Sequence, residues 1–299
     1  MAIASPPGVG QVIDGVIEGQ AQRLDPLAEQ VQGWLRNAVA RGGPTGLQLK
    51  NFLHGIWLGH PLHPALTDVP IGAWSAALLM DLFGPSKGAD AAVAIGTLAA
   101  VPTALAGLAD WIDTEGKPRR VGLVHATLNS LGLGLYVWSW LARRSGNRQL
   151  GVLLSTTGYS VGVVSAWLGG ELVDRMGTGV SRNAWEPPVQ DFQVAAREAD
   201  LREGQLAAGE ITVDGQKLPL VLLKQGGQIY ALSGVCSHWG GPLAEGQLVG
   251  ECVQCPWHGS QFSMRDGSVR QGPAQFAQPC FETRVRDGNV EVRTPRAAR

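Results

Sequence analysis

Two short stretches decide the fold of the C-terminal part of this chain: CSHWGGPL at residues 236–243 and CPWHGSQF at residues 255–262. Together they form the pattern C-x-H-x16-C-x2-H, with Cys236 and His238 in the first stretch and Cys255 and His258 in the second. Zinc sites usually pair cysteine with cysteine and histidine with histidine. Here each stretch supplies one thiolate and one imidazole, so the spacing favours a centre shared by two loops.

The sequence around these stretches predicts a small antiparallel β domain. From Phe192 onward, short β-rich runs alternate with the turn dipeptides Asp214-Gly215, Gly226-Gly227 and Asp287-Gly288, which are typical of hairpins. A [2Fe-2S] cluster with two cysteines on one iron and two histidines on the other takes one ligand of each kind from each loop. Glycines such as Gly240 and Gly259 let loop backbones approach the sulfurs of such a cluster.

With these features, residues 191–295 resemble a Rieske [2Fe-2S] domain. The similarity runs from the hairpins through both ligand stretches to Gly272-Pro273-Ala274, which resembles the proline loop of the family. The resemblance implies that Cys236 and Cys255 bind one iron, that His238 and His258 bind the other, and that Pro273 lies beside the cluster.

Departures from subfamily patterns indicate which kind of Rieske domain this is. Members from cytochrome bc complexes carry a second cysteine in each ligand loop, where this chain has Gly241 and Trp257. The loops are therefore expected without a cross-link, as in Rieske ferredoxins and oxygenases. Ser260 matches a serine that bonds a bridging sulfide in high-potential members, whereas Phe262 replaces a tyrosine. Losing one of these hydroxyls predicts a midpoint potential in the lower half of the roughly −150 to +300 mV Rieske range.

The composition of the rest of the chain indicates a membrane protein. Only 16% of the 299 residues are charged, against about a quarter in an ordinary soluble domain. The formal net charge of −1 excludes a protein that binds nucleic acid through bulk positive charge. Neither a disordered chain nor an N-terminal secretory signal fits the sequence.

Four apolar stretches precede the β domain, at about residues 65–83, 91–109, 121–142 and 150–170. Each approaches the roughly 20 residues that a helix needs to cross a bilayer core, and the last three contain no Asp, Glu, Lys or Arg. We therefore predict a multi-domain chain, with an all-α four-helix transmembrane bundle followed by the all-β Rieske domain. A soluble buried bundle is the alternative.

The predicted domains are an N-terminal amphipathic helical segment at 1–50, the transmembrane domain at 51–175, a linker at 176–190 and the Rieske domain at 191–295. Within the first segment, apolar residues recur at helical spacing between Leu24 and Val39. Asp25 and Pro26 are suited to begin this helix. It is expected either on the membrane surface or against a neighbouring domain.

An even number of spans places the N-terminus and the Rieske domain on the same side of the membrane. More basic residues flank the spans on that side than on the other, which predicts that both are cytoplasmic, in an integral protein of the cell membrane. The shared side has Lys50, Lys117, Arg119, Arg120, Arg175 and Arg182, and the opposite side has Lys87, Arg143, Arg144 and Arg148.

Residues 50–180 resemble an uncharacterised four-helix membrane family with the motifs HPLHPALTDVPIG, VHATLN and GGELVDRMGTGV. Because the number of spans is even, the polar residues at these span ends are expected on the same side of the membrane as the Rieske domain. Ionisable groups in a membrane domain suggest a functional site. The candidate residues of this site are His60, His63, Asp68, His125, Asn129 and Glu171.

Imidazoles at this face suit a haem iron or a hydrogen bond to a quinone, and a pair such as His63 and His125 could ligate haem b between helices. The alternative is structural: His60 and His63 cap the first span, Asp68 bonds backbone amides and His125 bonds a carboxylate.

We therefore expect a membrane-anchored Rieske electron-transfer protein that passes single electrons to and from unknown redox partner proteins. It is expected to be a carrier or an oxidoreductase component rather than a stand-alone enzyme. Three alternatives remain open: the ferredoxin component of a separate oxygenase, a subunit of a quinone- or haem-linked membrane oxidoreductase, and a redox sensor.

Overall fold

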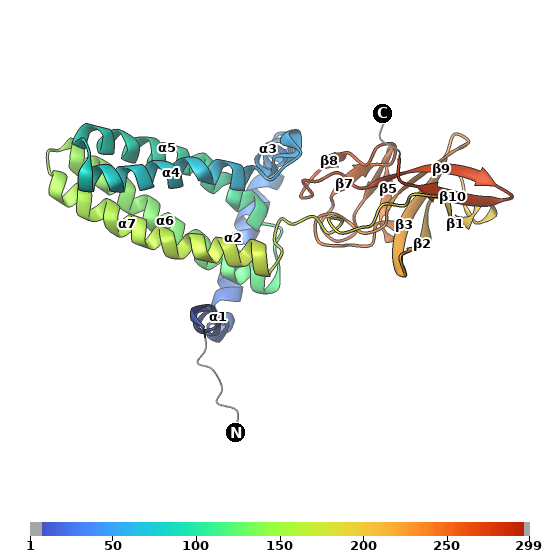
Figure 1. Cartoon of the computed structure of the whole chain (residues 1–299), viewed down its shortest axis with the longest axis horizontal. Coiled ribbons are helices and arrows are strands. Elements are labelled where there is room, and N and C mark those ends of the chain that lie inside the picture. Colours follow the sequence, from blue (N-terminus) through green and yellow to red (C-terminus); the bar gives the residue numbers. More distant parts are fainter. Residues whose placement is uncertain (1–7, 296–299) are drawn as a thin grey trace, which may run out of the picture. The chain divides into compact units, whose positions relative to one another are not determined.

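The computed structural model of the chain describes residues 8–295, which form two compact units. One unit comprises residues 8–49 and 62–178 and is helical, and the other comprises residues 50–61 and 179–295 and is built mainly from strands (Figure 1). The expected fold class, an all-α part with four apolar helices followed by an all-β part, is confirmed.

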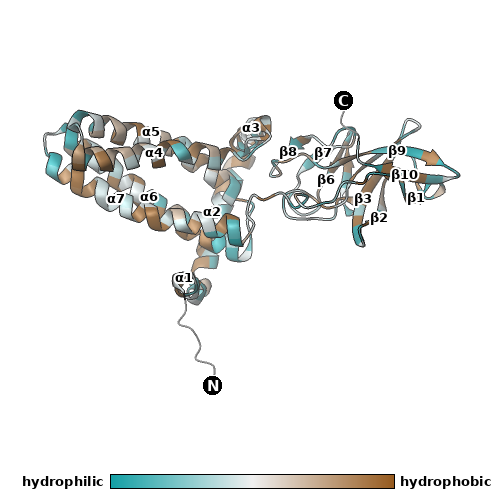
Figure 2. Cartoon of the chain, viewed as in Figure 1, coloured by the Kyte–Doolittle hydropathy of each residue, from teal (hydrophilic) through white to brown (hydrophobic). Residues whose placement is uncertain are grey.

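Four long helices form most of the first unit: α4 (Leu62–Phe83), α5 (Ser86–Trp111), α6 (Gly116–Arg144) and α7 (Arg148–Gly170). A π-helical turn, Glu171–Arg175, continues α7. All four are long and apolar enough to cross a membrane. Each begins two to five residues before the predicted span. Hydrophobic stretches run along all four helices (Figure 2), and many of their large hydrophobic side chains are exposed.

The helical unit contains an internal repeat that relates the hairpin α4–α5 to the hairpin α6–α7. Helices α5 and α7 begin at Ser86 and Arg148, which are 62 positions apart. The same offset joins glycine to glycine at positions 72 and 134, 84 and 146, 96 and 158, and 107 and 169. The glycines at 96, 158, 107 and 169 each lie against a ring from the other helix of their hairpin, so these small residues allow the helices of both hairpins to pack in the same way.

Contacts between equivalent residues show that the two hairpins face each other about an approximate two-fold axis. The Trp74 ring stacks on the ring of Tyr136, 62 positions later, with centroids 4.0 Å apart. A Cβ at Gly96 would collide with Trp74, and one at Gly158 would press on Tyr136. A residue that touches its own equivalent lies at the symmetry axis, so α4 and α6 line this axis.

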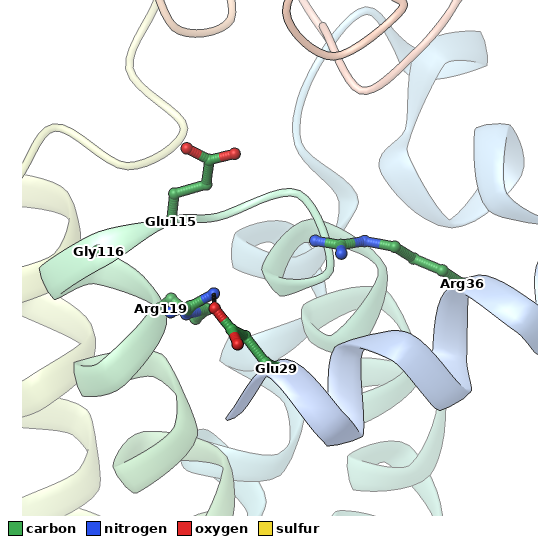
Figure 3. A pocket seen from close by; sticks show the side chains of 5 residues that line it. All are labelled: Glu29, Arg36, Glu115, Gly116 and Arg119. Carbon is green, nitrogen blue, oxygen red and sulfur yellow. Dashed lines mark hydrogen bonds and ion pairs between the residues drawn. The ribbon is translucent and has the colours of Figure 1, made fainter. Parts of the chain in front are cut away.

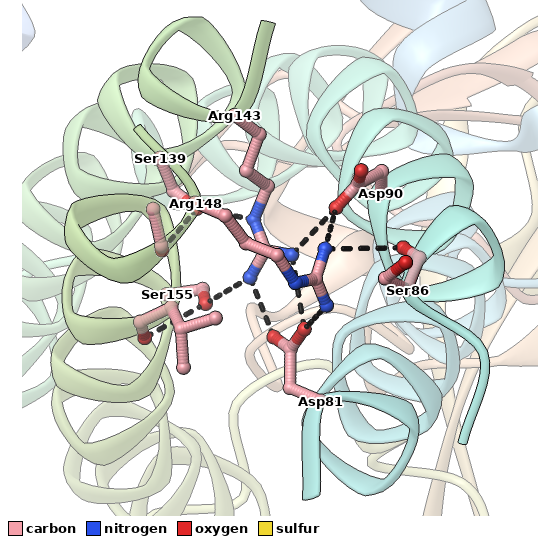
Figure 4. Close-up of polar contacts among 9 residues, drawn as sticks. Asp81, Ser86, Asp90, Ser139, Arg143, Arg148 and Ser155 are labelled. Atoms are coloured by element: carbon pink, nitrogen blue, oxygen red, sulfur yellow. Dashed lines mark hydrogen bonds and ion pairs between the residues drawn. The ribbon is translucent and has the colours of Figure 1, made fainter. Parts of the chain in front are cut away.

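At the end of the bundle where α4 finishes and α5 begins, buried charges are neutralised by each other (Figure 4). The Arg143 guanidinium contacts Asp81 at 2.5 Å and Asp90 at 2.7 Å, and Arg148 contacts the same two carboxylates. Arg143 also donates to the hydroxyls of Ser139 and Ser155. Multiple partners of this kind are needed to hold charges inside an apolar bundle.

Three helices precede the bundle: α1 (Val9–Gly19), α2 (Ala21–Arg41) and α3 (Gly43–His54). The expected amphipathic helix is part of α2, but it begins earlier than Asp25, and Pro26 lies inside it. Asp25 does not cap the helix, because its carboxylate pairs with Arg120 of α6.

Helix α2 packs on the connection between α5 and α6. The buried Gln32 amide donates to the carbonyls of Trp111 and Thr114. Nearby, Glu29, Arg36, Glu115, Gly116 and Arg119 line a polar surface pocket, across which Arg119 and Glu29 form a salt bridge of 2.9 Å (Figure 3). Helix α2 thus belongs to the helical unit.

The second unit contains two antiparallel sheets. The larger sheet has the strand order β1-β10-β9-β4-β3-β2 and the smaller has the order β5-β6-β7-β8. Their bounds are β1 (Gln193–Arg197), β2 (Leu206–Val213), β3 (Gln216–Gln225), β4 (Gln228–Ser233), β5 (Gln247–Val249), β6 (Cys252–Gln254), β7 (Gln261–Ser263), β8 (Val269–Gln271), β9 (Cys280–Arg286) and β10 (Asn289–Arg293).

Strand β3 separates two hydrophobic cores. Leu220 and Leu222 point into the core of the large sheet, whereas Val221 and Leu223 point into a second core with Phe262. This division follows the two-residue period of a strand. The second core also contains Cys236 and Cys255, so the loops that carry the ligand motif are anchored in it.

Candidate iron–sulfur site

Two loops with the same hydrogen-bond pattern present the four residues of the ligand motif. The first loop follows β4 and the second joins β6 to β7. In each loop the cysteine N–H donates to a carbonyl five residues later, from Cys236 to Gly241 and from Cys255 to Ser260. In each, a glycine four residues after the cysteine donates back to the cysteine carbonyl.

These two glycines, Gly240 and Gly259, have φ angles of +84° and +75°. This left-handed conformation strains residues with a Cβ, so glycine is required where each loop turns. The glycines expected beside the centre therefore give the ligand loops their shape.

The thiols of Cys236 and Cys255 face each other inside the second core. They are 1% and 3% exposed, and they form a hydrogen bond with each other. The hydrogen bond from Cys236 lowers the pKa of Cys255 to about 6, while the same interaction and burial raise the pKa of Cys236. Each sulfur also accepts backbone N–H groups two and three residues further along its loop. Such donors favour thiolates, the form that binds metal.

The two imidazoles lie beside each other on the half-buried side of the loops. The rings of His238 and His258 have centroids 5.1 Å apart and are nearly perpendicular. Nδ1 of His238 is buried without a hydrogen-bond partner among residues 8–295. Burial, followed by the positive charges of neighbouring groups, lowers the pKa of His238 to about 2. The ring is thus neutral, with a nitrogen suited to hold a metal ion.

Gly241 explains why the loops have no room for a second cysteine. A Cβ at this position would lie 2.7 Å from Cys255 Sγ and 3.1 Å from the Trp257 ring. The cysteines described by the structure are all free thiols, so the ligand loops are joined by packing rather than by a disulfide.

Two residues beyond the second ligand pair lie in the same core. Ser260 is fully buried and its Oγ accepts the backbone N–H of Ala274 at 3.0 Å. Phe262 is also fully buried and packs in the core around the thiols. Of the two positions compared with the family's serine and tyrosine, Ser260 thus supplies a hydroxyl and Phe262 supplies a ring without one.

The segment around Pro273 supports the first ligand loop. Gln278 accepts the N–H of Ser237 and donates to the Ser233 carbonyl, and the Ser237 hydroxyl donates to the Phe276 carbonyl. The proline loop therefore fixes the backbone between Cys236 and His238.

Sequence reasoning missed a second support, the segment 50–61. The structure groups this segment with the β unit. Asn51 accepts the N–H of Gly272 at 3.2 Å, and His60 packs edge-on against Phe276. These contacts join residues more than two hundred positions apart, so no local sequence pattern predicts them.

The described residues contain no group of three or more His, Cys, Asp or Glu side chains around one ion position. This fits a cluster in which each of two irons takes only two protein ligands. The facing thiols, the unpartnered buried Nδ1 and the backbone N–H groups directed at sulfur are the donor set that a [2Fe-2S] cluster needs.

The polar residues expected at one face of the membrane domain are only partly brought together. His63, His125 and Asn129 form one group, because the two rings lie 6.5 Å apart and the Asn129 amide lies 3.0 Å from Nε2 of His125. Glu171 instead pairs with Arg175, Asp68 is exposed on α4, and His60 belongs to the β unit.

Two family models match the chain. Residues 191–282 match the Rieske [2Fe-2S] domain, which implies a [2Fe-2S] cluster, and residues 59–182 match the family described as "Predicted membrane protein (DUF2231)". Both resemblances drawn from the sequence motifs are confirmed.

Curated relatives match the Rieske region. Apoptosis-inducing factor 3 of Homo sapiens is 32% identical over 114 residues, which cover 38% of this chain but only 18% of that protein. Ferredoxin CarAc of Metapseudomonas resinovorans is 35% identical over 25% of this chain and 69% of its own length. The anthranilate 1,2-dioxygenase ferredoxin subunit of Burkholderia cepacia is 34% identical over 27% of this chain and 73% of its length. The chain therefore belongs to the Rieske [2Fe-2S] family, and it carries a DUF2231 membrane domain in the same polypeptide.

Proposed function

We propose that this chain is a membrane-anchored electron-transfer protein that holds a [2Fe-2S] cluster between its two ligand loops. Cys236 and Cys255 bind one iron, and His238 and His258 bind the other. When bound, the cluster takes up and releases one electron at a time.

The observation that carries this proposal is the environment of His238. Its Nδ1 is buried and has no hydrogen-bond partner among the described residues, although unsatisfied buried polar atoms are rare in proteins. The nitrogen lies in a loop whose cysteine faces the cysteine of the matching loop. A metal bond to Nδ1 satisfies this atom.

The residues around the ligands tune and expose the centre. Lys50 and Arg182 place positive charge near His238, which favours the reduced cluster because the added electron is negative. Trp257, next to the ligand His258, is 57% exposed. An exposed aromatic ring beside a redox centre is suited to contact a partner protein.

Helices α4 to α7 supply the membrane anchor in this proposal. Their length and apolar surface support four spans, and the excess of basic residues on one side supports cytoplasmic termini and a cytoplasmic Rieske domain in the cell membrane. Fixing a carrier in the membrane restricts its partners to proteins that reach the same surface.

A second candidate is the ferredoxin component of a separate oxygenase. It is favoured by the relative named as a ferredoxin subunit of anthranilate 1,2-dioxygenase. Both candidates use the same cluster, and they differ in whether the electron acceptor is an oxygenase.

EPR and visible spectra of the dithionite-reduced full chain in detergent test the proposed centre. We expect a Rieske spectrum, its loss in Cys236→Ser and His238→Ala, and its retention in the matched controls Cys252→Ser and His63→Ala. In His258→Cys, a cluster with three cysteines should show a lower potential, because histidine ligands raise it. A spectrum that survives in His238→Ala contradicts the ligand set.

A further inference from the structure

His63 on α4 and His125 on α6 meet inside the helical unit. Their ring centroids are 6.5 Å apart and their planes are perpendicular. Two imidazoles that bind on opposite sides of one metal ion, each through a nitrogen at about 2 Å, have ring centroids about 6 Å apart. The observed separation therefore suits one ion between the two rings.

Hydrogen bonds fix which nitrogen of each ring carries the proton. Nδ1 of His63 lies 2.9 Å from the Thr103 carbonyl, and Nδ1 of His125 lies 2.8 Å from the Ser165 carbonyl. A carbonyl only accepts, so each Nδ1 is protonated and each neutral ring has its lone pair on Nε2. This second bond, from the ring to a carbonyl, is the usual support of a metal-binding histidine.

A glycine one helical turn after each carbonyl partner leaves room for the ring against the second helix of its hairpin. A Cβ at position 107 would lie 2.8 Å from His63 Cε1, and one at position 169 would lie 3.2 Å from His125 Cε1. Any larger residue would push the rings away from their positions.

All parts of this arrangement obey the 62-residue repeat. It relates His63 to His125, Thr103 to Ser165 and Gly107 to Gly169. The site is thus two copies of one half-site facing each other at the approximate two-fold axis, where ligand sites of repeat-built membrane proteins are commonly found.

The number of ligands that the protein supplies indicates which metal centre fits between the two rings. No third His, Cys, Asp or Glu joins these two rings within residues 8–295, whereas zinc usually takes four or three protein ligands. Haem iron receives four nitrogens from its macrocycle and needs only axial ligands from the protein, and helix bundles hold such cofactors between facing helices.

We propose that His63 and His125 are the two axial ligands of one b-type haem held between the hairpins. The Asn129 amide donates to Nε2 of His125 at 3.0 Å, and binding of the iron to Nε2 replaces this hydrogen bond. The proposal is independent of the Rieske ligands.

The test is a titration of the detergent-purified full chain with ferric protoporphyrin IX, followed by reduced-minus-oxidised spectra and EPR. We expect one haem per chain, sharp Soret and α bands, and the strongly anisotropic low-spin signal of perpendicular imidazole planes. His63→Ala and His125→Ala should each weaken binding by at least about tenfold, whereas His60→Ala should bind normally.

Two further measurements separate ligand loss from misfolding. The Rieske signal reports on each variant independently, and added imidazole should restore the low-spin spectrum of His63→Gly. Absence of stoichiometric haem binding in the parent chain, or unchanged low-spin spectra in both alanine variants, overturns the proposal. A chain that binds a quinone at this place but no haem overturns it as well.

Discussion

The Ser260 hydroxyl oxygen accepts the backbone N–H of Ala274 at 3.0 Å. Because that oxygen is already used as an acceptor and is fully buried, the hydroxyl proton remains to be donated within the site. A donor at this position stabilises the more negative, reduced cluster and raises its potential.

Replacing Ser260 by alanine should therefore lower the midpoint potential. Loss of one hydrogen bond to a charged acceptor corresponds to a shift on the order of 60 mV for a one-electron couple. Redox titration followed by EPR measures this shift. An unchanged potential in Ser260→Ala indicates that the hydroxyl does not reach the cluster.

Phe262→Tyr should shift the potential in the opposite direction. The Phe262 ring is fully buried beside the thiols, and a phenol there adds the second hydroxyl that this chain lacks. An increase on the order of 60 mV is expected, again by redox titration. A decrease contradicts the assignment of this position.

Gly241→Ala should impair cluster loading while leaving the helical unit intact. The new Cβ would lie 2.7 Å from Cys255 Sγ, closer than real contacts allow, so the second loop must move. Iron and sulfide content per chain measures the effect. Gly250→Ala is the control: its φ of +61° strains the backbone, but nothing lies within 4 Å of the new Cβ, so it introduces strain without the clash and should load normally.

The buried carboxyl group of Glu186 should make the free energy of unfolding of the β unit depend on pH. Burial raises its pKa above the usual 4.5, despite hydrogen bonds from Ser233 and Asn183. The folded state therefore binds the proton more tightly than the unfolded state, and stability decreases as the pH rises from 4.5 through the folded-state pKa.

Glu186→Gln should remove this decrease and leave the chain at least as stable at pH 7. The amide keeps an acceptor oxygen for both donors, and it avoids burying a charge. Thermal unfolding of the loaded chain, followed by visible circular dichroism at several pH values, measures it. The exposed Glu210→Gln should show the parental pH profile, and an equal slope in Glu186→Gln refutes the explanation.

Asp81→Asn should destabilise the helical unit strongly. It leaves the buried Arg143 with weaker compensation, and breaking a buried pair from one side costs about 3–5 kcal/mol. Melting of the protein in detergent should show this loss, whereas Asp68→Asn, an exposed position on the same helix, should melt like the parent. Equal melting of both variants contradicts a structural role for the pair.

The sequence was informative where chemistry is local. Metal-ligand spacing is set within a loop, so Cys236 and His258 could be proposed as ligands from short motifs, and the four apolar helices could be predicted from their length and composition. The start of α2 was placed wrongly because Asp25 and Pro26 suit a helix end, whereas the Asp25–Arg120 pair and the packing of α2 outweigh that preference.

Long-range pairings could not be read in this way. The carbonyl that accepts the hydrogen bond of His63 belongs to Thr103, forty positions later on another helix. The side chain of Asn51 accepts a hydrogen bond from Gly272, which is 221 positions away. The 62-residue repeat did leave a signal, in four pairs of glycines at constant offset, and comparing the sequence with itself would have found it.

Asp81 and Arg143 occupy equivalent positions in the two hairpins, yet they carry opposite charges and pair across the axis. Two copies of the same hairpin would place like charges against each other at this position, and their repulsion would disfavour pairing of a hairpin with its own copy. Each half is thus complementary to the other and incompatible with a copy of itself. Such halves must be produced in equal numbers, and joining them in one polypeptide guarantees that stoichiometry.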